Sequence, residues 1–101
     1  MTDQVGLLIE ILLDRNARAD ERDDAASYLG QYPEQRVVDA LAVVASSSEE
    51  DEVLVATAGE SIAEIWERLD RIQPEILAAL APPARREVEA LLRTRAPHLL
   101  T

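Results

Sequence analysis

Cysteine, lysine and phenylalanine are all absent from this chain of 101 residues. Without cysteine, the chain cannot form disulfides, thiolate metal sites or a cysteine nucleophile. A secreted domain of this size would often need disulfides, so we expect an intracellular, cytoplasmic protein. The ten basic residues are all arginine, which we interpret as coding bias and not as chemistry.

Long apolar runs are missing as well. No run approaches the ~20 residues that a membrane-spanning helix needs. Residues 1–15 lack the basic leader of a signal peptide, and Glu10 interrupts their apolar stretch. We therefore expect neither secretion nor a membrane partner.

Positive charge is scarce, and the formal net charge is −10. Residues 1–34 and 35–70 carry charges of −5 and −7, whereas residues 71–101 carry +2. Such an acidic chain is repelled by nucleic acid and by anionic membranes. The charge therefore favours a basic protein as partner.

Helix-forming residues dominate the chain. Hydrophobic residues make up 48% of it, while glycine and proline number only three and five. Apolar residues recur at helical spacing and predict helices over about 3–14, 20–31, 33–45, 49–69, 74–80 and 83–93. Because the links are short, we expect one all-α domain over 1–101 with antiparallel hairpins over about 3–31, 34–70 and 73–94.

The helix starts and the core can be assigned from the same pattern. Asp3, Asp20 and Ser48 are the expected N-caps. Trp66 falls on the apolar stripe of the fourth helix, which indicates a core position. The other residues predicted to face inward are Val5, Leu8, Ile9, Leu12, Ala25, Ala26, Leu29, Tyr32, Val37, Val38, Leu41, Val44, Ala45, Val55, Ala58, Ile62, Ile65, Leu69, Val88, Leu91 and Leu92.

A shift of 33 residues brings two parts of the chain into register. The matched pairs are Ala25 with Ala58, Leu29 with Ile62, Gly30 with Ala63 and Tyr32 with Ile65. Small residues at matched positions let two helices lie close, and the large ones fill the groove between them. A period in this range is typical of stacked helical hairpins that cannot bury their apolar faces alone.

The stretch RDDAASYLGQYPEQRVVDALAVV and the later DEVLVATAGESIAEI resemble the HEAT-repeat family in its short bacterial form. The family pattern, A-x-x-x-L-G, a turn and then V-x-x-L, falls on Ala25, Leu29 and Gly30, and on Val38 and Leu41. Ala63 replaces the glycine in the second copy, and the third hairpin matches only as a helix pair. The resemblance covers about residues 18–80 and implies a short α-solenoid that serves as a binding scaffold. The alternative is a generic helical bundle whose composition imitates a repeat.

Ten residues are candidates for contact with a partner. Glu60, Glu64 and Glu67 follow the i, i+4, i+7 spacing, so they share one stripe of the fourth helix, opposite its apolar face. Tyr28 matches polar Ser61 in the second copy and is expected to point partly outward. The remaining candidates lie near helix starts and are Asp20, Asp23, Asp24, Glu49, Glu50 and Asp51. The competing interpretation is a solvated face with acids placed at helix starts.

No set of residues points to an enzyme. His98 is the single histidine, and the sequence fixes no acid or serine near it. The chain has no glycine-rich phosphate loop and no Ser–His–Asp order. Metal binding by residues 49–52 would be weak, because consecutive helical residues point in different directions. We therefore expect no catalysis, no cofactor and no metal.

We expect an acidic module that neutralises a basic protein partner. The leading hypothesis is the immunity protein of a bacterial toxin pair, which blocks a nuclease-type toxin through charge complementarity. The alternative is a generic HEAT-like adaptor or homo-oligomeric subunit whose binding tolerates salt. A third hypothesis, an enzyme or a pigment-handling protein, has no supporting residues.

Overall fold

The computed structural model describes residues 3–101, which form six α-helices and a short 3-10 helix. The α-helices are α1 (Gln4–Leu13), α2 (Ala19–Leu29), α3 (Gln35–Ala45), α4 (Glu52–Leu69), α5 (Pro74–Ala79) and α6 (Pro82–Arg95), and the 3-10 helix η1 is Pro97–Leu100. No strand occurs within this range. The prediction of an all-α protein with six helices is confirmed.

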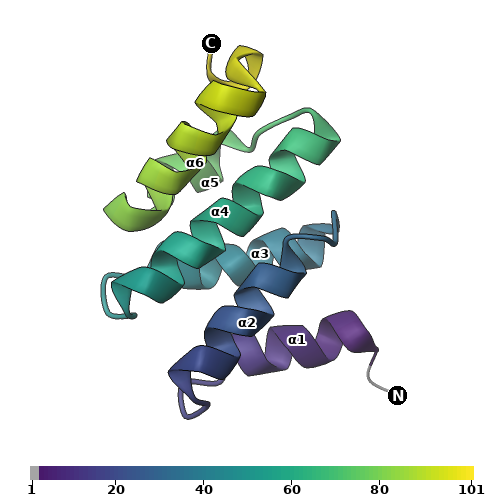
Figure 1. Cartoon of the computed structure of the whole chain (residues 1–101), viewed down its shortest axis with the longest axis vertical. Coiled ribbons are helices and arrows are strands. Elements are labelled where there is room, and N and C mark those ends of the chain that lie inside the picture. Colours follow the sequence, from purple (N-terminus) through teal and green to yellow (C-terminus); the bar gives the residue numbers. More distant parts are fainter. Residues whose placement is uncertain (1–2) are drawn as a thin grey trace.

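The helices form two layers (Figure 1). Helices α2, α4 and α6 lie side by side and run in the same direction, and α1, α3 and α5 lie behind or below them. Helix α4 is central, because it packs against α2, α3 and α6. Contacts between α1 and α2 and between α3 and α4 correspond to the first two expected hairpins. Helix α5 has only six residues, none of them fully buried.

The core is largely the one that the periodicity predicts. Every residue expected to face inward on α3 is buried, and so are Trp66 and the predicted inner residues of α4 up to Ile65. Leu69 is the exception, at 39% exposed, because it is the last residue of α4 and lies where the chain leaves the core. Tyr32, Ile9 and Leu91 are only partly buried and pack against the rim of the core.

Two carboxylates cap helices, one of them unexpectedly. Asp3 Oδ1 accepts a hydrogen bond from the N–H of Gly6 at 2.7 Å, so the predicted cap of α1 is confirmed. The predicted cap of α4, Ser48, is wrong. Asp51 holds that position, and its carboxylate accepts hydrogen bonds from the N–H groups two and three residues further on, at 2.9 and 3.3 Å. Helix α4 therefore begins at Glu52, the last residue of the acidic run, and not at the start of that run.

The predicted cap of α2 is also wrong. The helix begins at Ala19, and Arg18 occupies the N-cap position without a side-chain capping bond. Asp20 lies in the first turn, where the helix dipole favours a negative charge. Its Oδ2 atom is 2.6 Å from an Nη atom of Arg18. The acid thus stabilises the helix start through charge and not through capping.

Small residues lie at close contacts between neighbouring helices of the front layer. A Cβ atom on Gly59 would lie 2.6 Å from the backbone of Ala84, so the backbones of α4 and α6 approach each other closely there. At the contact between α2 and α4, Ser61 Oγ donates a hydrogen bond to the carbonyl oxygen of Ala26 at 2.6 Å. Ala26 and Gly59 are 33 residues apart, so both contacts involve small residues at positions that match under the same shift.

Candidate partner-binding surface

A buried ion pair was not expected from the sequence. Arg22 lies on the inner side of α2, and its two Nη atoms donate to Glu50 at 2.9 and 2.6 Å. Its Nε atom donates to the carbonyl oxygen of Leu12 at 2.9 Å. The two side chains are only 8% and 11% exposed. The ion pair therefore fastens the end of α1 and the loop before α4 to α2.

This ion pair changes the role expected of Glu50. Hydrogen bonds from Arg22 lower the pKa of Glu50, against the opposing effect of burial. Because its carboxylate is enclosed and already bound, Glu50 does not offer a free charge to a partner. We correct its assignment from a contact residue to a structural one.

The glutamate stripe of α4 consists of Glu60, Glu64 and Glu67, and its members differ in exposure. Glu60 is exposed, whereas Glu64 and Glu67 are partly buried. Glu67 reaches toward α6, with an oxygen 3.7 Å from Arg95. Glu64 reaches toward α2, since a Cβ on Gly30 would lie 3.0 Å from its Oε2 atom. Two of the three members of the stripe are therefore partly buried beside the neighbouring helices, and only Glu60 is fully open to solvent.

Glu64 carries an unfavourable charge environment. Burial raises its pKa, the neighbouring Glu60 raises it further, and Arg95 opposes the shift. Neither Glu60 nor Glu64 has an ion-pair partner within 4 Å among the residues described. The free protein therefore holds a partly dehydrated carboxylate next to like charges, an arrangement that a cationic group would relieve.

Helix α2 contributes exposed candidates to the same layer. Asp24 is exposed and forms no ion pair with any residue of 3–101. Tyr28, one turn later, is 57% exposed, so its predicted outward orientation is confirmed. In the loop before α4, Glu49 is exposed, with an oxygen 3.9 Å from Arg15. Asp51 is exposed as well, although its carboxylate is engaged in capping.

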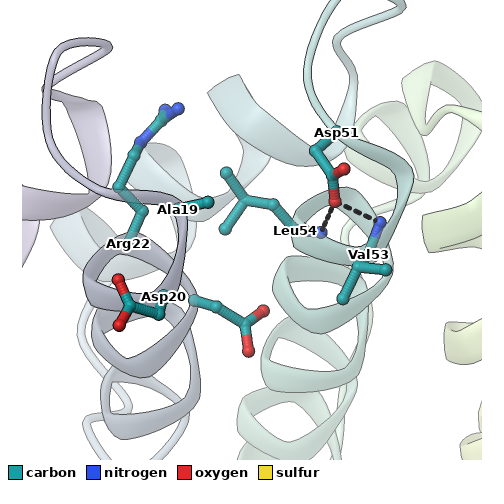
Figure 2. Close-up of a pocket in the computed structure, with 7 residues that line it drawn as sticks. Ala19, Asp20, Arg22, Asp51, Val53 and Leu54 are labelled. Carbon is teal, nitrogen blue, oxygen red and sulfur yellow. Dashed lines mark hydrogen bonds between the residues drawn. The ribbon is translucent and has the colours of Figure 1, made fainter.

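A small cavity lies where α2 and α4 begin (Figure 2). It measures about 280 Å³ and is lined by Ala19, Asp20, Arg22, Asp23, Asp51, Val53 and Leu54. Most of its wall is apolar. Asp23 is partly buried, and its Oδ1 atom is fully enclosed without a hydrogen-bond donor among the described residues. The cavity joins two acidic helix starts that are about 30 residues apart in the sequence.

Trp66 and His98 are the two remaining residues that the sequence singled out. Trp66 is buried and donates from Nε1 to Gln73 Oε1 at 3.3 Å, so its core assignment is confirmed. His98 is exposed on η1, with Nε2 2.6 Å from Asp70 Oδ1.

Within residues 3–101, no cluster of three or more acids or histidines is placed to hold a metal ion. No helix in that range is long and apolar enough to cross a membrane.

We use the name acidic surface for the outward-facing part of α2 and α4 together with the start of α4. Its residues are Asp20, Asp23, Asp24, Tyr28, Asp51, Glu60, Glu64 and Glu67. Comparison with known proteins found no matching family model, no matching curated protein and no matching solved structure. The fold and the surface together define the class: a small all-α protein whose front helices present carboxylates.

Proposed function

We propose that the chain is an acidic protein-binding module whose acidic surface receives a basic protein. The observation that carries this proposal is Glu64, which is partly buried beside Glu60 without an ion-pair partner among the described residues. Such an arrangement costs stability in the free protein, and binding of a cation would recover it. Functional surfaces commonly hold charged groups in such environments.

The partner role that fits best is inhibition. A net charge of −10 on an 11.1 kDa chain produces a field that attracts a basic protein and speeds its capture. Many nucleic-acid-processing enzymes are basic at their active sites, and an acidic module that covers such a site blocks the substrate. In this proposal the chain is a toxin-neutralising immunity protein, and it performs no catalysis itself.

We further propose that the two layers are a short HEAT-like solenoid. Three observations support this assignment. The front helices run in the same direction (Figure 1), α1 and α3 contact each other behind them, and the small residues Ala26 and Gly59, 33 residues apart, each lie at a close contact with the next front helix. A solenoid layer of parallel helices provides a broad face for one macromolecular partner.

An adaptor role is the second candidate, and exposed apolar side chains favour it. Leu7 on α1 and Val43 on α3 are 46% and 62% exposed, and both lie outside the acidic surface. Binding through these side chains would be driven by apolar burial and would tolerate salt. The two candidates therefore differ in the surface used and in the effect of ionic strength.

The test is a comparative affinity capture with matched variants. The first variant neutralises the acidic surface by Asp24→Asn, Glu60→Gln and Glu64→Gln. The control removes the same charge from the other layer by Glu10→Gln, Asp39→Asn and Glu75→Gln, one exposed acid each on α1, α3 and α5. Both variants have the same net charge, so only the position of the lost carboxylates differs.

We expect one basic protein to be retained by the wild type and by the control, released by salt, and lost from the first variant. Retained nuclease activity of the bound protein would exclude the inhibitory role while leaving the binding surface intact. Equal capture by both variants would show that the acidic surface is not the interface. Salt-resistant capture that is lost on Leu7→Ser and Val43→Ser would support the adaptor instead.

A further inference from the structure

The cavity between the starts of α2 and α4 combines an apolar wall with a carboxylate that lacks a donor. Ala19, Val53 and Leu54 form the apolar part, and Val53 is 66% exposed at the rim. With a volume of about 280 Å³, the cavity falls just below the roughly 300–1,000 Å³ of small-molecule sites. It has the size and the lining of a receptor for one long side chain.

Most of the charged groups around the cavity are already engaged. The Asp51 carboxylate is bound to backbone N–H groups at the start of α4, as the dashed lines of Figure 2 show. Asp20 is held by Arg18. The guanidinium group of Arg22 points away from Asp20 (Figure 2) and is bound to Glu50. Because Glu50 neutralises the charge of Arg22, a cation that enters the cavity is not strongly repelled by this arginine.

Asp23 is the carboxylate that remains available. Its enclosed Oδ1 atom accepts no hydrogen bond from any residue of 3–101, and a buried acceptor without a donor is unfavourable. Asp23 lines the cavity, so a cationic group that enters the cavity comes close to this carboxylate. Asp20 is not available in this way, because Arg18 donates to both of its oxygens, at 3.1 and 2.6 Å. A cationic group from outside therefore finds its acceptor in Asp23.

We propose that this cavity receives one arginine side chain of the protein partner. The aliphatic stem lies along Val53 and Leu54, and the guanidinium group donates to the carboxylate of Asp23. Arginine fits better than lysine because its planar head is weakly hydrated and donates two parallel hydrogen bonds. The inference rests on the proposed function, since it names the group by which a basic partner is recognised.

The experiment uses the full chain and a defined probe, N-acetyl-arginine amide, with N-acetyl-citrulline amide as its neutral isostere. Each is titrated into isotope-labelled protein, and backbone amide shifts are followed by NMR. We expect the arginine probe to bind with a dissociation constant in the millimolar range, as befits so small a ligand. Shifts should concentrate at residues 19–23 and 51–54, and the citrulline probe should leave them unchanged.

Two variants separate the cavity from the general charge. Asp23→Asn removes the orphaned carboxylate, while Asp24→Asn removes the same charge from the exposed neighbour outside the cavity. We expect the first to weaken the arginine probe at least about tenfold and the second less than about twofold. Equal weakening by both variants, or equal shifts with citrulline, overturns the proposal. The citrulline comparison needs no variant and does not depend on how the substitutions fold.

The outcome also distinguishes this inference from the proposed function. If a basic protein is captured through the acidic surface while the arginine probe shifts no resonance near the cavity, the arginine receptor is refuted and the proposed function stands. If the probe binds as expected and no basic protein is captured, the receptor stands and the proposed function fails.

Discussion

The buried pair of Arg22 and Glu50 allows the sharpest prediction about stability. The substitution Glu50→Gln keeps the size of the side chain but removes the negative charge that faces the guanidinium group. Arg22 then remains enclosed, at 8% side-chain exposure, with its Nε atom still bound to Leu12. A buried cation without a counter-charge is strongly unfavourable.

The size of the effect follows from the burial of both partners. Removing one member of a buried pair typically costs about 3–5 kcal/mol, and we expect about 3 because the pair retains slight exposure. A domain of this size has a total free energy of unfolding of about 5–15 kcal/mol. At about 4–8 °C per kcal/mol for a domain of this length, Tm should fall by roughly 12–24 °C.

The acid dependence gives a second readout of the same pair. Arg22 lowers the pKa of Glu50 below its ordinary value. The stabilisation is therefore fully present above the pKa of the unfolded chain and is lost as pH falls through the lower folded value. The wild type should lose stability below about pH 4.5, and Glu50→Gln should remove this pair's share of that loss.

Thermal and urea unfolding, followed by circular dichroism, measure both effects. Glu49→Gln is the matched control, because Glu49 is the adjacent residue, is 78% exposed and forms only a long ion pair, 3.9 Å from Arg15. The Tm of this control variant should differ from that of the wild type by less than about 2 °C. The double variant Arg22→Met, Glu50→Met should be more stable than either single variant, since an apolar pair leaves no buried charge. A Tm change for Glu50→Gln as small as that of the control would refute the reasoning.

Three further predictions concern other sites. Gly59→Ala should cost about 1–3 kcal/mol in urea unfolding, because its Cβ meets the backbone of Ala84; an unchanged midpoint would mean that α4 and α6 are less closely packed. Asp51→Ala should cost about 1 kcal/mol through loss of the cap, whereas Ser48→Ala should cost nothing measurable. Glu64→Gln should raise stability at pH 7 by a few tenths of a kcal/mol. Because burial raises the pKa of Glu64, protonation of this one group adds to wild-type stability as pH falls through that pKa, and the variant should lack this contribution.

The helices could be predicted from the sequence because they depend on local information. Apolar spacing along each segment identified the inner stripes, and proline marked the starts of α5 and α6. The caps were harder, since several acids and serines compete for one position. Ser47 accepts hydrogen bonds from the N–H groups of Glu49 and Glu50, which turns the chain before α4 and leaves Asp51 as its cap.

The ion pair could not be predicted, because its partners are 28 residues apart and depend on how two hairpins pack. One local signal was present: Arg22 precedes Ala25 and Ala26 by three and four residues, so it lies on their stripe. Charged residues are seldom buried without a partner, so its place on that stripe implied a hidden acid. The cavity likewise depends on the relative position of α2 and α4, which periodicity does not specify.

The most direct test of the central claim is the association rate constant of the captured basic partner, measured by stopped-flow fluorescence at several salt concentrations. For the wild type and for the Glu10, Asp39 and Glu75 control, we expect a fall of about tenfold or more between about 0.05 and 0.5 M salt. The variant neutralised at Asp24, Glu60 and Glu64 should associate slowly even at low salt and respond weakly to it. Equal rates and equal salt dependence for the two variants would contradict the claim that the acidic surface receives the partner.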